Sequence, residues 1–157
     1  MLNREAIARR IPHQGRMCLL DQVVFWDADR IECSAVSHRD AMNPLRAFGR
    51  LGVAAGIEYA AQAMAVHGAL VGEAAGQSHA VPRAGYLASI RGASLHAARL
   101  DDVQSPLQVR AQRLMGDSNN IVYSFELAAG ERLLLRGRAT VVLDAAMAQR
   151  MAAGESV

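Results

Sequence analysis

The chain has 157 residues, which is enough for one domain with a hydrophobic core and hardly enough for two. Apolar residues make up 52% of it, which excludes a disordered chain. The net charge is +2 and the basic residues, all arginines, are scattered without a basic run, so the composition argues against nucleic-acid binding.

The first third of the chain predicts a short helix, a β-hairpin and a loop. The helix is expected over residues 2–10, with Asn3 as its N-cap. The hairpin is expected over residues 17–37, because two β-rich runs flank a polar turn at 27–30. Residues 38–50 have no apolar period and contain proline and glycine, so they predict a loop.

The rest of the chain predicts one long helix followed by strands. Residues 51–71 are apolar enough for a buried helix, and residues 72–82 have the Gly, Ala and Ser content of a connector. Residues 144–157 are expected to be a weakly ordered tail. Between connector and tail, strand patterns separated by turn residues occur at 85–100, 106–115, 121–128 and 132–143.

This order of elements predicts an α+β domain with the hot-dog fold, in which an antiparallel sheet of about six strands wraps around one long central helix. We expect a single domain over residues 1–157, with its core at about 10–143. The free edges of such a sheet need cover, which a second subunit would supply, so we expect a dimer.

A membrane span is not expected in the long apolar run, although about 20 residues suffice to cross a bilayer. The run is rich in alanine and glycine and contains Glu58, and both features disfavour insertion. The charged N-terminus lacks the apolar region of a signal peptide. We therefore expect a soluble, cytoplasmic protein. Cys18 and Cys33 have no ligand spacing, so we expect neither a metal nor a cofactor.

Glu58 is the only formal charge in the long apolar run. Gln62 lies four residues later on the same helix face, among small side chains that leave room beside the carboxyl group. Glu58 is thus a candidate general acid, which Gln62 could orient or supply with a water. The alternative is that Glu58 pairs with an arginine across an interface.

Two histidines are candidate bases. His13 lies between Pro12 and Gly15, where the chain enters the first strand, and His38 opens the loop before the long helix. His67 is nine residues from Glu58, on the far side of the helix, and is expected to be structural. At the helix start, the amides of Gly52 and Val53 are expected to be unpaired and able to hold a developing oxyanion.

Three segments resemble the 3-hydroxyacyl-[acyl-carrier-protein] dehydratases, which are hot-dog proteins: IPHQGRMCLLDQVVFWD, GIEYAAQAM and GYLASIRGASLHAARL. The resemblance covers residues 10–143 and is closest to a divergent branch found in clusters that make aryl polyene and xanthomonadin-type pigments. It implies dehydration of 3-hydroxyacyl thioesters to trans-2-enoyl thioesters, in fatty-acid or polyene-pigment biosynthesis. It implies two partners: an acyl carrier protein, and a second hot-dog subunit in a homodimer or heterodimer.

The resemblance also assigns roles. In the family a histidine removes the α-proton, a carboxyl group protonates the departing hydroxyl, and the two side chains come from different subunits. Glu58 maps onto the acid and Gln62 onto the accompanying glutamine. Pro44 stands where the main branch has its loop histidine, so we expect His13 to be the base, with His38 as the alternative. Besides the catalytic pair, we expect four substrate-binding residues: Gln62, Gly52, Val53 and His38.

Two other functions remain open at this stage. Hot-dog thioesterases hydrolyse acyl thioesters with one carboxylate on the same helix and need no histidine. A non-catalytic partner subunit of a heteromeric dehydratase would have the same fold without chemistry of its own.

Overall fold

The computed structural model describes residues 1–77, 85–117 and 119–143. The expected tail and the second half of the expected connector lie outside these ranges. The elements are β1 (Leu2–Asn3), α1 (Arg4–Ala8), η1 (Gly15–Met17), β2 (Gln22–Trp26), β3 (Arg30–Ala35), η2 (Ser37–Arg39), η3 (Val53–Ala55), α2 (Gly56–Ala74), β4 (Gly85–Leu95), β5 (Leu107–Gly116), β6 (Asn120–Ala129) and β7 (Arg132–Leu143).

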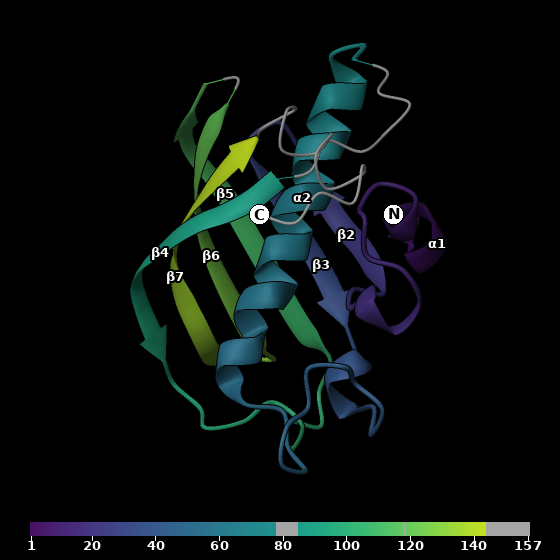
Figure 1. Ribbon diagram of the computed structural model, residues 1–157, viewed down its shortest axis with the longest axis vertical. Helices are drawn as coiled ribbons and strands as arrows, with labels where there is room; N and C mark the ends of the chain where they lie inside the picture. The colour runs from purple at the N-terminus through teal and green to yellow at the C-terminus, as the bar shows by residue number, and fades with distance from the viewer. Residues whose placement is uncertain (78–84, 118, 144–157) are drawn as a thin grey trace, which may run out of the picture.

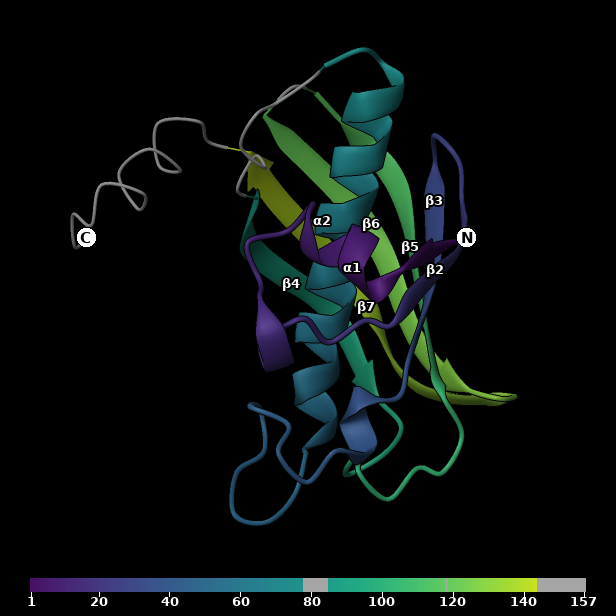
Figure 2. The same ribbon diagram turned by 90° about the vertical axis from the view of Figure 1, so that its right-hand side faces the viewer.

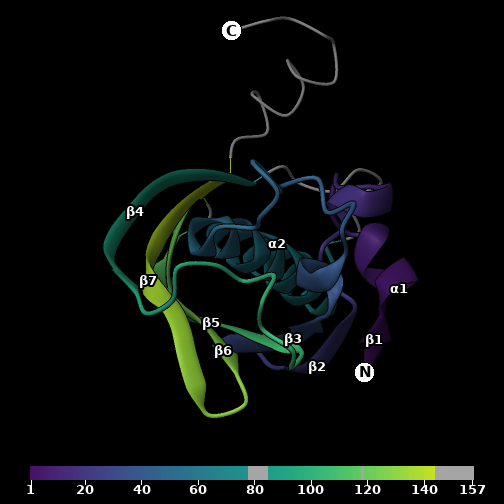
Figure 3. The same cartoon turned by 90° about the horizontal axis from the view of Figure 1, so that it is seen from below.

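The strands form one antiparallel sheet in the order β1-β2-β3-β5-β6-β7-β4. The sheet curls around α2, as the end-on view in Figure 3 shows, and the expected α+β hot-dog fold is confirmed. Seven strands rather than about six are present because β1 adds a two-residue strand beside β2. Alternate residues of β6 are buried under α2, as period-two patterning requires: Ile121, Tyr123, Phe125 and Leu127.

Helix α2 runs along the concave face of the sheet (Figure 1). It begins at Gly56, five residues later than the sequence pattern predicts, because the preceding residues pair with the segment after β4. Val53 N donates to Ala98 O at 3.2 Å, and Leu100 N donates to Leu51 O at 2.8 Å. Within the described ranges, no helix is long and apolar enough to cross a bilayer.

Small residues let α2 approach the sheet closely at its first turn. A β-carbon on Gly56 would lie 2.8 Å from Leu127 Cδ2 and 2.9 Å from Leu135 Cδ2, and both leucines are fully buried. A β-carbon on Gly68, on the same helix, would have no atom of the described residues within 4 Å. Gly56 is therefore required by packing, whereas Gly68 is not.

This contrast predicts opposite effects of the same substitution. Gly56→Ala should destabilise the fold by about 1–3 kcal/mol, because the added methyl overfills a packed contact. Gly68→Ala should stabilise it by up to about 1 kcal/mol, because alanine is the better helix former. Urea unfolding of both variants measures this, and equal effects of the two substitutions would contradict the packing assigned to Gly56.

Candidate active site

The structure brings His13 and Glu58 together. His13 Nε2 lies 3.0 Å from Glu58 Oε1, and the two side chains are 30% and 33% exposed. Glu58 comes from the first turn of α2, and His13 comes from the segment between α1 and η1, which lies alongside that helix (Figure 2). The pair is thus assembled from two segments far apart in the sequence, and solvent reaches it from one side.

Both members of the pair belong to one chain. The family resemblance implied that the histidine and the acid come from different subunits. Here the residues between α1 and β2 fold back onto α2, so that a single chain supplies both groups. A histidine next to a carboxyl group can pass a proton to it directly, which is the arrangement that paired acid–base chemistry requires.

Gln62 holds this arrangement in place. Its Nε2 donates to Glu58 Oε1 at 3.1 Å and to Met17 O at 2.8 Å, and its Oε1 accepts from Leu19 N at 2.9 Å. The side chain is fully buried. Its carboxamide therefore orients Glu58, which is one of the two roles expected from the sequence. It also holds the backbone of residues 17–19, close to His13, against the helix.

A second buried network, which the sequence analysis missed, fixes the loop before α2. The Tyr59 hydroxyl lies 2.8 Å from Ser37 Oγ and accepts from Asn43 Nδ2 at 3.0 Å. Ser37 Oγ also donates to Leu19 O at 2.7 Å. In the sequence, the Asn43-Pro44 pair predicts only a loop. No local pattern indicates that the hydroxyl of Tyr59, the residue after Glu58, would hold that loop in place.

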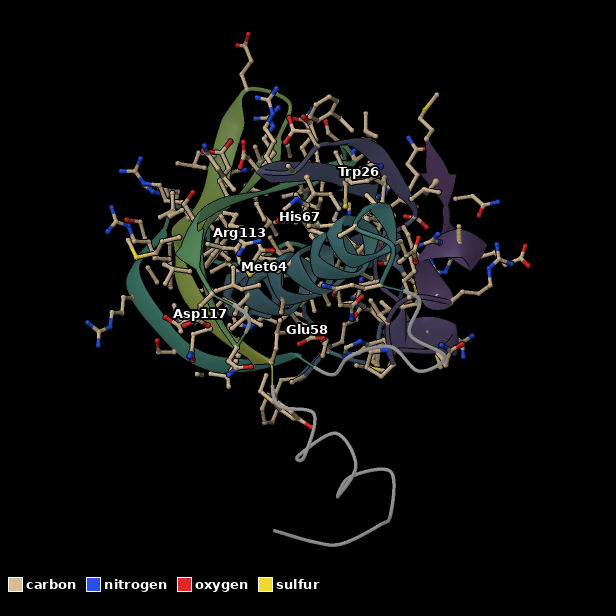
Figure 4. All side chains as sticks on the ribbon, turned by 90° about the horizontal axis from the view of Figure 1, so that it is seen from above. Trp26, Glu58, Met64, His67, Arg113 and Asp117 are labelled. Atoms are coloured by element: carbon tan, nitrogen blue, oxygen red, sulfur yellow. The ribbon has the colours of Figure 1, made fainter. Side chains whose placement is uncertain are left out.

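His38 does not join the pair. Its ring is fully buried and its Nε2 lies 3.0 Å from Val103 O. The ring of His67 is also fully buried, between the Tyr123 hydroxyl at 2.9 Å and Asp27 O at 2.9 Å. Figure 4 shows His67 and Glu58 on opposite sides of α2, as the sequence spacing predicts. Burial lowers the pKa of both histidines, which favours their neutral forms.

The expectation for the helix start is wrong for Val53. Its amide donates to Ala98 O and is not free to stabilise an oxyanion. The reason is the bridge between Gly52 and Arg99, which pairs this stretch like a short strand. The amide of Gly52 remains a predicted substrate contact.

Two cavities lie elsewhere along these elements, and neither is lined by His13 or Glu58. One of about 320 Å³ lies beside the second half of α2. Its lining combines small and apolar residues with charged ones: Ala65, Gly68, Gly72, Ile121, Val141, Leu143, Arg9, Arg10, Glu73, Arg113 and Asp117. The other, of about 500 Å³, lies near η1 and η2 and is lined by three arginines, Arg4, Arg16 and Arg39, among other residues. The described ranges contain no group of three or more His, Cys, Asp or Glu residues able to hold a metal ion.

A curled sheet around one helix, with a carboxyl group in the first turn of that helix, defines a protein of the hot-dog class. Residues 5–153 match the model of the ApeP-like family, described as ApeP dehydratase. The chain therefore belongs to the ApeP-like dehydratase family. A comparison with curated proteins gives no match.

Several solved structures share the fold. The dehydratase heterocomplex ApeI:P from Xenorhabdus doucetiae is 21% identical, with a TM-score of 0.79 over 93% of this chain and 96% of that one. An HP0420 homologue from Helicobacter felis is 10% identical, with a TM-score of 0.61 over 88% of each chain. A mutant thioesterase, PA1618 from Pseudomonas aeruginosa, is 16% identical, with a TM-score of 0.54 over 78% and 81%. Dehydratases and thioesterases thus share this architecture.

The buried histidines predict that stability depends on pH. Because the folded protein keeps His67 neutral, the unfolded chain binds more protons below a pH of about 6.5, and stability is lost as the pH falls further. Urea unfolding midpoints between neutral and mildly acidic pH should therefore decrease for the wild type, and less steeply for His67→Gln. The exposed, non-titrating Gln104 supplies the control, since Gln104→Ala should leave the slope unchanged. An unaltered slope in His67→Gln would contradict this assignment.

Proposed function

We propose that this protein dehydrates 3-hydroxyacyl thioesters carried by an acyl carrier protein, giving trans-2-enoyl thioesters in fatty-acid or polyene-pigment biosynthesis. The observation that carries the proposal is the 3.0 Å contact between His13 Nε2 and Glu58 Oε1, held by Gln62. Membership of the ApeP-like dehydratase family supports it independently.

In this mechanism Glu58 acts as the general acid and His13 as the general base. His13 Nε2 removes a proton from Cα of the substrate, and Glu58 protonates the β-hydroxyl as its carbon–oxygen bond breaks. The electron pair of the Cα–H bond becomes the new double bond, and water leaves. The proton on His13 then returns to Glu58 across their contact, which restores the starting pair.

The acyl chain has a path along α2. Glu58, Ala61, Ala65, Gly68 and Gly72 recur every three or four residues and so follow one helix face, from the reacting pair to the 320 Å³ cavity. Gly68 lies about 15 Å along the helix axis from Glu58, at 1.5 Å per residue. We assign this cavity to the part of the acyl chain that is distant from the thioester.

The thioester end of the proposed substrate is joined to the carrier protein. Arg4, Arg16 and Arg39 line the 500 Å³ cavity together with Asp21 and Asp40, and Arg4 pairs with Asp21 at 3.0 Å. We therefore assign the phosphate of a phosphopantetheine arm to Arg16 and Arg39, because arginine suits phosphate. The heterocomplex formed by the structural relative supports assembly with a second hot-dog subunit.

The direct test mixes the purified chain with a 3-hydroxyacyl carrier-protein thioester and follows enoyl absorbance together with free thiol. Enoyl formation without thiol release is the expected result. Thiol release would overturn the proposal in favour of a thioesterase with Glu58 activating water. The absence of both signals would favour a non-catalytic subunit. Activity that appears only after a second hot-dog protein is added, and that persists when this chain carries Glu58→Gln, would assign the chain that role.

Glu58→Gln should lower the dehydration rate by about 10²–10⁴-fold, the typical contribution of a general acid, while the fold persists. The new amide oxygen can still accept from Gln62, so the local geometry is retained. Glu126→Gln is the matched control, because Glu126 pairs with Arg110 at 3.0 Å on the face of β6 opposite its buried side chains. The rate is measured by enoyl absorbance, and full turnover by Glu58→Gln would rule out its acid role.

Gly68→Leu should select against long acyl chains. The larger side chain enters space that no described residue occupies, so turnover of a long-chain substrate should fall about tenfold or more, while that of a four-carbon substrate persists. Steady-state rates on both substrates measure the effect. Equal losses on the two substrates would contradict the path along α2.

A further inference from the structure

Arg113 is a charged residue at a position of β5 that faces the central helix. The inward-facing residues that precede it at every second position are buried and apolar: Leu107, Val109 and Ala111. Its cross-strand neighbour on β6 is Tyr123, which is buried, and directly opposite residues of an antiparallel pair lie on the same face of the sheet. Figure 4 shows Arg113 on the inner side of the curled sheet, toward α2. Both residues line the 320 Å³ cavity.

The guanidinium of Arg113 has no counterion in the part of the chain that the structure describes. No hydrogen bond or ion pair with another described residue engages this half-buried side chain. The two other arginines that line the cavity are paired, Arg9 with Glu5 at 2.9 Å and Arg10 with Glu73 at 2.9 Å. A charge that loses part of its hydration in a fold is ordinarily compensated by a partner. Arg113 lacks that compensation.

Asp117 is the other carboxylate on the wall of this cavity, and it stabilises its own turn. Its Oδ1 accepts from Asn119 N at 2.7 Å and from Asn120 N at 2.8 Å, and these hydrogen bonds hold the pKa of Asp117 below its usual range. It is exposed to solvent. Asp117 therefore does not neutralise Arg113, whose charge faces the cavity unpaired.

The neighbours of Arg113 leave its N–H groups as the free donors on this wall. Asp27 O can only accept, so His67 Nε2, at 2.9 Å from it, carries the proton. The neutral Nδ1 of His67 then accepts from the Tyr123 hydroxyl at 2.9 Å, which uses the one O–H of that residue. Burial is the main cause of the lowered pKa of His67, and the nearby charge of Arg113 lowers it too. A ligand that reaches this wall thus meets donors and a positive charge.

The cavity is the place assigned above to the part of the acyl chain distant from the thioester, and Gly68 and Gly72 keep it open on the side of the helix. A hydrocarbon end would leave the charge of Arg113 without a partner. A hydroxyl end would accept a hydrogen bond but would leave the charge unbalanced. A carboxylate would supply both the acceptors and the counterion, in the two-pronged geometry that a guanidinium favours.

We propose that the 320 Å³ cavity selects acyl chains that end in a carboxylate, and that Arg113 is the residue that binds this terminal group. The inference rests on the proposed function in taking the cavity as the site of the acyl chain. Arg113 takes no part in the chemistry assigned to His13 and Glu58, so it determines specificity only.

Two ten-carbon probes measure this selectivity. One is N-methyl decanamide, which ends in a methyl group, and the other is the same amide with a carboxylate at its far end. Both imitate the acyl chain without a reactive thioester. In isothermal titration calorimetry the wild type should bind the carboxylate probe about tenfold or more tightly than the methyl probe, as expected for hydrogen bonds to a charged group.

Arg113→Met should abolish this preference by weakening the carboxylate probe alone, because methionine keeps the apolar stem and removes the charge. Arg9→Met is the matched control. Arg9 lines the same cavity but is paired with Glu5, so its replacement should leave the ratio of the two affinities unchanged.

Several outcomes would overturn the proposal. These are failure of both probes to bind, equal affinity of the wild type for the two probes, a preference that survives in Arg113→Met, and an equal loss in Arg9→Met. A hydroxyl-terminated probe that binds as tightly as the carboxylate would overturn the choice of an anionic group. The wild-type comparison needs no variant, so it decides even where Arg113→Met does not fold. Because these readouts need no turnover, an inactive chain with an Arg113-dependent preference would refute the proposed dehydration alone.

Discussion

The carboxamide of Gln62 joins the two segments on which the candidate site depends. It donates to Glu58 and to the chain beside His13, and it accepts from that same chain. Both of its N–H groups and its oxygen are engaged in a fully buried position, where an unsatisfied polar group would be costly. These hydrogen bonds hold the segment next to His13 against α2, and so they fix the distance between His13 and Glu58.

Helix α2 has two faces that differ in their contacts. One face meets the sheet through residues such as Gly56 and the buried His67, which admit little change. The other carries Glu58 and then small residues, of which Ala65, Gly68 and Gly72 line the cavity that we assign to the acyl chain. The proposed acid and the proposed path of the acyl chain therefore lie on the same face of α2, opposite the face that packs on the sheet.

The sequence predicted the elements well because their signals are local. Alternation in β6, the N-cap at Asn3, which accepts from Ala6 N at 3.0 Å, and the isolated charge of Glu58 are all visible in short windows. The paired amide of Val53 was missed, since its partner, Ala98 O, lies far along the chain. The same limit hid the bonds of Gln62 to residues 17–19. His13 was favoured as the base by its neighbours together with the family resemblance, and its contact with Glu58 needed the fold.

The central claim is that one chain supplies both His13 and Glu58, and subunit complementation tests it most directly. His13→Ala and Glu58→Gln chains with different tags would be co-expressed, and the mixed assemblies would be isolated and assayed for enoyl formation. If each site draws both groups from one chain, the mixed assemblies should be no more active than either variant alone. Activity well above both variants would show that the two groups come from different subunits, as in the family's main branch, and would contradict this account.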